Sequence, residues 1–391
     1  MRVLMAHNLY RLAGGEDVVF EAEARLLERH GHEVVRYTVD NDDLSAISPW
    51  RSGPNAVWNR RTYREVVDVC RERRPDVAHF HNTFPLMSPS VYFAARRSGV
   101  PVVQTLHNYR LICPNALLFR QGRVCEDCVG KSFAFPGIFH SCYRGSRSAS
   151  AAAAATMAFH RLRRTWSSQV DAYVALTEFA KGKFVAGGLP DERIHIKPNF
   201  LEEDPGPGSG DGRYALFVGR LAPEKGLRVL LDAWTMIGRA MPLKIVGAGP
   251  EEPYVRSRAA DVPGVEVLGR QDKAALRELT MAAGIFVFPS TWYEPFGLTV
   301  IEALATGLPV LASAHGSAAE LVEEAVTGLH FRPADADDLA AKVHRVLQEP
   351  DLLASMRPRC REAYLRRFTA EANYDVMMRV YGAAYEVFAG R

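Results

Sequence analysis

The sequence lacks long apolar runs. None of the apolar runs in its 391 residues approaches the roughly 18 residues that a membrane-spanning helix needs. The first ten residues, MRVLMAHNLY, contain too short an apolar stretch for a signal peptide and predict a first strand. We therefore expect a soluble, cytoplasmic protein. A hydrophobic content of 48% and a charged content of 24% are typical of a globular chain, and the length predicts two domains.

The sequence also lacks a large net charge, since its formal net charge is only +3. It contains little lysine, with 8 lysines against 40 arginines. Residues 1–199 carry 27 basic and 19 acidic side chains, a net of +8, whereas residues 200–391 carry 21 and 26, a net of −5. A basic first half indicates an anionic partner, but an arginine-rich composition explains it equally well. No stripe of basic and aromatic residues accompanies the charges, so nucleic acid is not expected as a partner.

Short apolar runs alternate with amphipathic stretches along the whole chain, from RVLMAH (2–7) onward. This alternation predicts an α/β fold of doubly wound parallel sheets. LEEDPGPGSGDG (201–212) has the composition of a linker. We therefore expect one domain over residues 1–200 and a second over 213–370. Residues 371–391 predict an amphipathic helix that can pack back on the first domain.

The stretch YEPFGLTVIEALATGLPV (293–310) holds two glutamates eight positions apart. It follows a predicted strand, and its helix is expected to begin at Leu298. Ligands of open α/β sheets bind at the carboxyl ends of strands, and anions bind at the N-termini of the helices that follow. Backbone N–H groups around Gly297, Leu298 and Thr299 can therefore face phosphate oxygens, while Glu294 and Glu302 accept hydrogen bonds from hydroxyl groups. The alternative is a plain strand–helix unit with two surface glutamates.

A second motif, GRLAPEKG (219–226), follows another predicted strand. Its cations, Arg220 and Lys225, suit a diphosphate. The alternative interpretation is a pair of solvated loop charges.

These residues together resemble glycosyltransferase family 4, the retaining GT-B glycosyltransferases. The resemblance rests on Glu294 and Glu302 in E-x7-E and on Arg220 and Lys225 in G-R-x4-K-G. It extends over nearly the whole chain, in order, through GGED (14–17), HNTFP, TLHNYRLICP, KPNF and VGAGP. It implies two Rossmann-like domains facing a cleft, with the acceptor on the first domain and a nucleotide-sugar donor on the second.

The resemblance also implies a role for each site residue. Arg220 and Lys225 would neutralise the leaving diphosphate, and Glu302 would hold the ribose hydroxyls. Glu294 would hold the transferred sugar, helped by the backbone at Phe296, Gly297 and Leu298. In the first domain, Gly15 would let a loop approach the diphosphate, and His107 would lie near the sugar and the reaction centre.

The implied activity is transfer of a sugar, with retention of configuration, from a UDP- or GDP-sugar to a hydroxyl acceptor. The acceptor would be a saccharide or a lipid-linked saccharide, in cell-envelope or exopolysaccharide synthesis. The leaving phosphate would take the acceptor proton, so no protein nucleophile and no catalytic metal are required. The motif DND (40–42) is interpreted as a solvated loop. Two alternatives stay open: a non-catalytic nucleotide-sugar-binding protein, and a sugar-nucleotide epimerase of the same fold.

The histidines at the predicted strand ends have structural alternatives. His79 is interpreted as a core residue and His81 as facing the cleft. The role of His107 depends on the resemblance more than on spacing, and the alternative for it is a structural capping role.

Four of the six cysteines lie within 30 residues, in the pattern C-x11-C-x2-C-x13-C. Cytoplasmic proteins rarely contain disulfides, and this spacing is compatible with a structural zinc ion. We therefore hypothesise a zinc-stapled insert over about residues 110–145. Unligated thiols and an iron–sulfur cluster are the alternatives. The proposed ligands are Cys113, Cys125, Cys128 and Cys142.

Several arginines surround the alanine-rich stretch 149–158. They indicate either a peripheral contact with an anionic membrane, at the inner face of the cell membrane, or ordinary solvated helix faces. The residues concerned are Arg144, Arg147, Arg161, Arg163 and Arg164.

Overall fold

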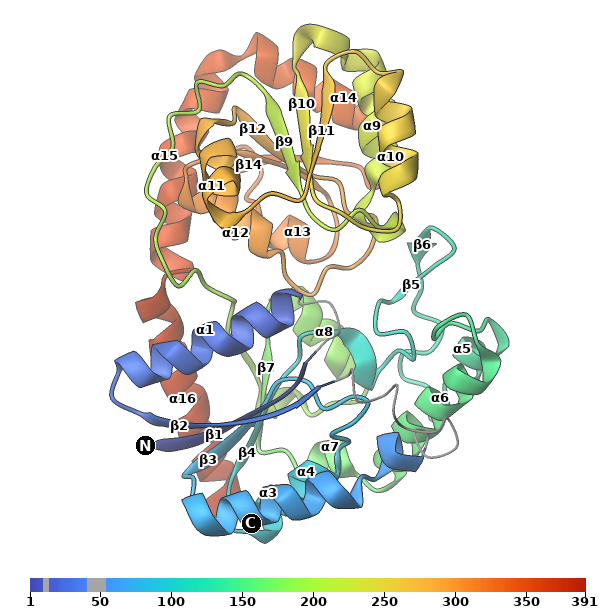
Figure 1. The fold of residues 1–391 in the computed structure, drawn as a ribbon, viewed down its shortest axis with the longest axis vertical. Helices are drawn as coiled ribbons and strands as arrows, with labels where there is room; N and C mark the ends of the chain where they lie inside the picture. Colours follow the sequence, from blue (N-terminus) through green and yellow to red (C-terminus); the bar gives the residue numbers. More distant parts are fainter. Residues whose placement is uncertain (10–13, 41–53) are drawn as a thin grey trace. The chain divides into compact units, whose positions relative to one another are not determined.

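The computed structural model describes residues 1–9, 14–40 and 54–391. The chain divides into two compact units, each with one six-stranded parallel sheet between helices (Figure 1). The predicted α/β fold class is therefore confirmed. The DND motif lies outside the described residues from its second position onward. Unit 1 comprises Met1–Leu118, Cys125–Asn199 and Glu371–Arg391, and unit 2 comprises Phe119–Val124 and Phe200–Ala370.

The sheet of unit 1 has the strand order β2-β1-β3-β4-β7-β8. The chain runs from β1 to the edge strand β2 and then returns to the other side of β1. The order of strands therefore reverses between β1 and β3, which is where open α/β sheets bind ligands. The strands are β1 (Arg2–Leu9), β2 (Glu33–Asp40), β3 (Val77–Phe80), β4 (Val102–Thr105), β7 (Ala172–Ala175) and β8 (Ile194–Ile196).

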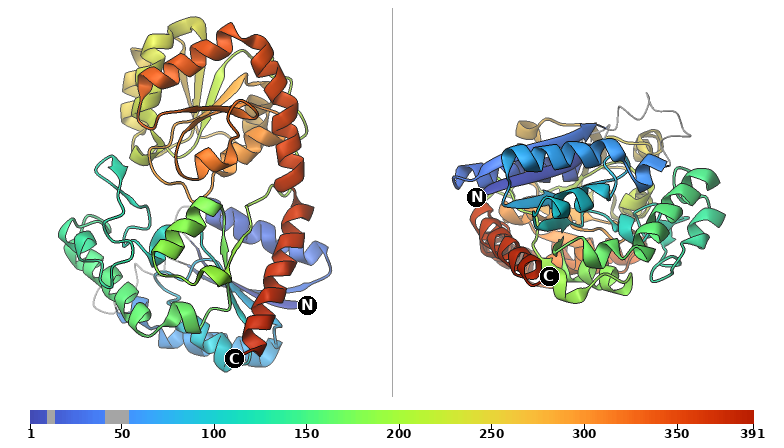
Figure 2. Two further views of the ribbon diagram at one scale, coloured as in Figure 1. Left: turned by 180° about the vertical axis from the view of Figure 1, so that it is seen from behind. Right: turned by 90° about the horizontal axis from the view of Figure 1, so that it is seen from below.

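The last helix of the chain, α16 (Ala370–Ala389), lies against the sheet of unit 1 (Figure 2). The Tyr381 hydroxyl lies 2.9 Å from Nδ1 of His79, and the Tyr385 hydroxyl donates to the Asp76 carbonyl at 2.7 Å. The other helices of unit 1 are α1 (Gly15–Arg29), α3 (Arg60–Arg73), α4 (Ser90–Arg97), α5 (Phe135–Phe139), α6 (Arg147–Leu162), α7 (Thr165–Ser168) and α8 (Glu178–Ala186), with short 3-10 turns at Tyr109–Leu111 and Asp191–Arg193.

The sheet of unit 2 has the order β11-β10-β9-β12-β13-β14, and its strand order reverses between β9 and β12. Two edge strands, β8 in unit 1 and β14 in unit 2, were not predicted, because both are short and carry a histidine among their apolar residues. The strands of unit 2 are β9 (Ala215–Val218), β10 (Leu243–Val246), β11 (Val265–Gly269), β12 (Ile285–Phe288), β13 (Val310–Ser313) and β14 (Gly328–Phe331).

Helices cover both faces of the unit 2 sheet, as a parallel sheet requires. One face packs in a core around the buried Trp234, whose ring N–H donates to the Met241 carbonyl at 2.8 Å. The helices are α9 (Leu227–Ile237), α10 (Glu252–Ala260), α11 (Lys273–Ala282), α12 (Leu298–Ala305), α13 (Gly316–Leu321), α14 (Ala336–Gln348) and α15 (Pro350–Arg367), with 3-10 turns at Pro223–Lys225 and Gly238–Ala240.

The predicted linker, residues 201–212, lies along unit 2. Its backbone N–H groups at Gly208 and Gly212 donate to the carbonyls of Thr306 and Ala282, both at 2.8 Å. A Cβ atom on Gly208 would lie 2.3 Å from the Met281 carbonyl oxygen. The glycines therefore let this segment dock against unit 2, where larger residues would clash.

The cysteine-rich insert contains a two-stranded antiparallel hairpin, β5 (Phe119–Arg120) and β6 (Arg123–Val124), followed by the short helix α5. No helix among the described residues of either unit is both long and apolar enough to cross a membrane.

Candidate functional site

The loops that follow β9 and β12 interlock at the switch point of unit 2. Gly226 has a φ of +71°, and a Cβ atom there would lie 1.8 Å from the Pro289 carbonyl oxygen. The Thr291 N–H donates to the Glu224 carbonyl at 2.9 Å. The two motifs that the sequence singled out, GRLAPEKG and YEPFG, are therefore in direct contact, although about 70 residues separate them.

Lys225 and Glu294 form an ion pair between these loops, with Nζ and Oε1 2.5 Å apart. The Ser290 hydroxyl donates to the same oxygen at 2.7 Å. Glu294 is buried, and the Ser317 hydroxyl holds its backbone by donating to its carbonyl at 2.6 Å. Lys225 is therefore not a solvated loop charge, and Glu294 is not a surface glutamate.

Arg220 lies in the same loop, with 62% of its side chain exposed. Its guanidinium donates to Oε1 of the buried Glu224 at 2.5 Å. Glu224 therefore orients the Arg220 side chain, while the guanidinium stays exposed to solvent. An anion at this loop can approach Arg220 without displacing a buried group.

Helix α12 begins as predicted, at Leu298, with Gly297 as its N-cap at a φ of +154°. The first N–H groups of a helix have no partner within it, so those of Leu298 and Thr299 can donate to an anion. The Phe296 side chain is buried and lies 6.2 Å from the Phe368 ring, measured between ring centroids. Only the backbone of Phe296 is therefore available to a ligand.

Glu302 lies one turn into α12 and is half-buried. Among the described residues, no hydrogen bond or ion pair reaches its carboxylate. Burial raises its pKa to about 7, against the opposing effect of the Lys273 charge. A carboxylate with this environment can gain from hydroxyl donors, because they would replace the solvent that burial has removed.

Several side chains of this site were not predicted from the sequence. His315, at the N-terminus of α13, places its Nε2 2.9 Å from the Ser290 carbonyl, and burial lowers its pKa. Ser290 and Ser317 contact Glu294 as described above. No spacing pattern marks these residues, since they meet Glu294 only through the fold.

A second group of polar residues lies at the switch point of unit 1. His107 follows β4 and is only 7% exposed, with its Nε2 2.9 Å from Nδ1 of His81. Burial lowers the pKa of both histidines well below its usual value. His79 is fully buried, as predicted, and His81 is buried beside it.

Gly15, predicted to approach the diphosphate, is the first residue of α1 and is exposed. The next residue, Glu16, accepts a hydrogen bond from the Asn108 side chain at 2.9 Å. The N-terminus of α1 therefore lies at the same edge of the unit 1 sheet as His107.

Two family models match the chain in succession. The model described as Glycosyltransferase Family 4 matches residues 13–204, and the model described as Glycosyl transferases group 1 matches residues 201–363. Their order and extent agree with the motifs that carry the resemblance.

The chain belongs to the family 4 glycosyltransferases. An uncharacterised glycosyltransferase of Methanocaldococcus jannaschii is 34% identical to it over 164 residues, 41% of this chain and 40% of that protein. A phosphatidyl-myo-inositol mannosyltransferase of Mycolicibacterium smegmatis is 31% identical over 176 residues, 44% of this chain and 45% of that protein. The chain therefore spans about two-fifths of the length of these relatives.

The fold is that of the GT-B glycosyltransferases. The structure of HepE from Anabaena in complex with UDP matches with a TM-score of 0.70 and 18% identity, covering 98% of this chain and 100% of that one. At this identity, the similarity supports the shared fold alone.

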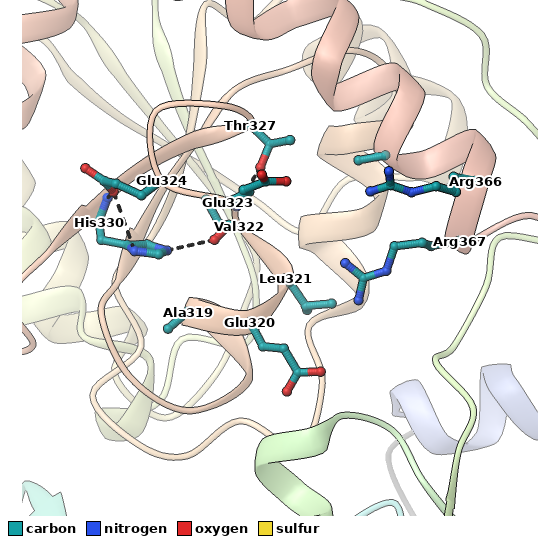
Figure 3. A pocket seen from close by; sticks show the side chains of 11 residues that line it. Ala319, Glu320, Leu321, Val322, Glu323, Glu324, Thr327, His330, Arg366 and Arg367 are labelled. Atoms are coloured by element: carbon teal, nitrogen blue, oxygen red, sulfur yellow. Dashed lines mark hydrogen bonds and ion pairs between the residues drawn. The ribbon is translucent and has the colours of Figure 1, made fainter.

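Unit 2 of this glycosyltransferase also has a pocket of about 390 Å³ between the end of α13, the loop before β14 and the end of α15 (Figure 3). Arg366 and Arg367 line one side, and Glu320, Glu323 and Glu324 lie across from them. None of the residues predicted for the donor lines this pocket. It is therefore separate from the Lys225–Glu294 site.

None of the four clustered cysteines forms a disulfide in the described structure. Cys113, Cys125 and Cys142 are all near enough to Cys128 to raise its pKa, although burial is the larger cause. A set of four thiols suits zinc, but no three of them have sulfur atoms within 4.8 Å of one another among the described residues. The sulfur atoms would have to draw closer to bind an ion, and the zinc hypothesis stays a prediction.

The buried apolar cluster around Cys128 is small and includes Ala134 and Ala154, so a bound metal ion would add stability at this point. We therefore predict that the purified protein carries about one zinc ion per chain and that Cys128→Ala removes it. Cys70→Ala, which removes a buried thiol outside the insert, is the control and should keep the metal. Metal analysis that finds less than about 0.2 zinc ions per wild-type chain would contradict the hypothesis.

Proposed function

We propose that this protein is a retaining glycosyltransferase that transfers a sugar from a nucleotide-diphosphate sugar to a hydroxyl acceptor. The observation that carries the proposal is the Lys225–Glu294 ion pair beside the N-terminus of α12, at the switch point of the unit 2 sheet. This arrangement supplies positive charge for a diphosphate and a carboxylate for sugar hydroxyls within one loop pair.

The donor diphosphate would receive three kinds of positive group. Arg220 offers an exposed guanidinium, Lys225 an ammonium, and α12 its free N–H groups. The diphosphate would compete with Glu294 for Lys225, which would free carboxylate lone pairs for the transferred sugar. The unpaired carboxylate of Glu302 would accept hydrogen bonds from the ribose hydroxyls.

The proposed chemistry needs groups that stabilise developing negative charge on the leaving phosphate. The acceptor would attack from the face that the nucleotide leaves, and the leaving phosphate would take its proton. This assigns charge neutralisation to Arg220 and Lys225, without a catalytic metal. The resemblance assigns His107 to the transferred sugar and Gly15 to the diphosphate.

UDP is the first candidate for the nucleotide, because the similar HepE structure holds UDP, with GDP as the second candidate. We predict that one of UDP, GDP, ADP and CMP raises the thermal midpoint of the wild-type protein. Glu302→Ala should lose most of that shift, because the ribose hydroxyls then lose their acceptor. A thermal-shift titration measures both.

The matched control is Glu302→Gln, which keeps the shape and removes the titration. In wild type, the ionised carboxylate of Glu302 is the stronger acceptor for the ribose hydroxyls, so nucleotide affinity should fall as the pH drops below about 7, by up to about tenfold for each pH unit. For Glu302→Gln, nucleotide affinity should depend on pH only through ionisation of the nucleotide phosphates. If none of the four nucleotides stabilises wild type at pH 8, the donor site is misassigned.

A non-catalytic nucleotide-sugar-binding protein and an epimerase are the rival functions. If the protein is a transferase, Glu294→Ala should lower turnover of the donor sugar by about a hundredfold or more. The transferred sugar would then lose a buried, charged acceptor for its hydroxyl groups. The same variant should bind the nucleotide at least as well as wild type, because Lys225 no longer pairs with a carboxylate.

Turnover is measured as nucleotide released and sugar transferred to a mixture of polysaccharide and lipid-linked acceptors. Glu251→Ala, which removes an exposed ion pair with Arg228, is the control and should be unaffected. Binding without any turnover would favour the binding protein. A change in the donor sugar without release of nucleotide would favour the epimerase.

We further propose that the acceptor lies at an anionic membrane surface, the cytoplasmic face of the cell membrane, and that residues 129–170 contact it. This segment contains six lysine and arginine residues and no aspartate or glutamate. It also holds five of the eleven exposed large hydrophobic residues of the described chain. These are Phe133, Phe135, Phe139, Phe159 and Leu162.

The exposed rings are not needed for the packing of the segment. Helix α5 lies against α6, where Ile138 and Met157 cover the small buried cluster at Cys128 (Figure 1). Phe135 and Phe139 remain 63% and 59% exposed. Exposed aromatic residues among basic ones are typical of surfaces that insert into anionic lipid interfaces.

We predict that the protein co-sediments with vesicles of phosphatidylcholine and phosphatidylglycerol more strongly than with phosphatidylcholine alone. The double variant Phe135→Ser/Phe139→Ser should weaken this binding by about tenfold or more. Leu347→Ser/Leu365→Ser removes two exposed leucines of unit 2 and should not weaken it. Equal binding to both vesicle types would count against the membrane contact.

A further inference from the structure

Unit 1 contains a buried ion pair that the proposed chemistry does not use. Lys197 Nζ lies 2.5 Å from Oε1 of Glu23, and both side chains are fully buried. The ammonium also donates to Oδ1 of Asn373 on α16 at 3.3 Å. A buried ion pair is costly to desolvate, and this one holds the Glu23 carboxylate in a fixed orientation.

The second oxygen of Glu23 faces the histidines. Oε2 lies 3.6 Å from Nε2 of His81, and neither atom has a hydrogen-bond partner among the described residues. The other nitrogen of His81, Nδ1, lies 2.9 Å from Nε2 of His107. Glu23, His81 and His107 thus form a continuous row that leads from the buried lysine to the edge of the sheet.

A metal ion is a second way to use these groups. Ligand atoms of Glu23, His79 and His81 lie within 4.8 Å of one another. However, Lys197 already supplies a cation to Glu23, and it would repel a metal ion. Both nitrogens of His79 already have hydrogen-bond partners, since Nδ1 lies 2.9 Å from the Tyr381 hydroxyl and Nε2 lies 2.7 Å from the Thr105 hydroxyl. The structure therefore favours a row of polar contacts over a metal site.

The carboxylate sets the direction of this row. A carboxylate only accepts hydrogen bonds, and Oε2 of Glu23 lies 3.6 Å from Nε2 of His81, so the nearby carboxylate favours the His81 tautomer with its proton on Nε2. Burial lowers the pKa of His81 and His107 well below its usual value, so both rings are neutral. Nδ1 of His81 is then a bare acceptor, and Nε2 of His107 must be its donor.

We propose that Glu23, held by Lys197, is a positioning residue that fixes His107 as the tautomer with a proton on Nε2 and a bare Nδ1. No described residue hydrogen-bonds this Nδ1. His107 therefore presents an acceptor, which suits a hydroxyl group of a sugar and does not suit a carbonyl or phosphate oxygen. The identity of that ligand rests on the proposed function, whereas the tautomer does not.

Nuclear magnetic resonance of protein labelled with nitrogen-15 in histidine tests the tautomer directly. In wild type without ligand, we expect His107 and His81 both to be protonated at Nε2 and bare at Nδ1. His107→Gln assigns the His107 signals by their loss. A proton on Nδ1 of His107, or a charged ring at neutral pH, would overturn the proposal even if no further variant folds.

Glu23→Gln should exchange donors and acceptors along the row of residue 23, His81 and His107. Lys197 is a donor only and stays on the amide oxygen, so the amide NH2 group would face His81 and donate to Nε2. His81 would then donate from Nδ1, and His107 would move its proton from Nε2 to Nδ1. The two nitrogen signals of His107 should exchange their positions. An unchanged spectrum in the folded variant would contradict the proposed role of Glu23.

Tyr381→Phe is the matched control. It removes a buried hydroxyl from His79 and leaves the Glu23–His81–His107 row intact, so the His107 tautomer should not change. Titration with UDP, GDP, ADP and CMP separates this inference from the proposed function. Failure of all four nucleotides to bind would overturn the donor site, whereas the tautomer in the ligand-free protein is read independently.

Discussion

The contact between Gly226 and the Pro289 carbonyl is the constraint on which the proposed donor site depends. In a doubly wound sheet the loops after β9 and β12 leave the same edge on opposite sides of the reversal in strand order. They can meet only if the backbones approach closely, which a residue with a Cβ atom at 226 would prevent. This approach brings Lys225 within 2.5 Å of Glu294 and lets Thr291 bond the Glu224 backbone. The geometry of the site therefore follows from backbone packing before any ligand is present.

Both units pair their buried charges internally. In unit 2, Glu224 orients Arg220 and Glu294 holds Lys225, so the cations are positioned without a bound anion. In unit 1, Lys197 neutralises Glu23 among buried histidines. Each pair offsets the cost of removing a charge from water. The ion pairs of the two units differ in how exposed their cations are. The unit 2 cations are open enough to exchange partners with a ligand, whereas the unit 1 pair is closed and acts only through its neighbours.

The resemblance and the strand–helix alternation predicted the fold class and the start of α12, and both are confirmed. These predictions depend on local features, because consecutive residues encode the end of a strand and the beginning of the next helix. The roles of the donor-motif residues stay predictions. The predictions were incomplete where a residue acts through distant neighbours. Ser290, Ser317 and His315 surround Glu294 without any spacing signal. The burial of His79 and His81 likewise depends on α16 and α1, which come from the two ends of unit 1.

The sequence by itself determined the types of the elements and the positions of charge and glycine at the strand ends, since both depend on short-range periodicity and backbone freedom. Only the tertiary structure decided which charges pair. Lys225 and Glu294 are 69 residues apart, and Glu23 and Lys197 are 174 apart. Their distances, burial and protonation depend on which strands are neighbours and on how deeply the loops pack. Those are properties of the folded chain, because electrostatic interactions act through space and depend on how much water the surrounding residues exclude.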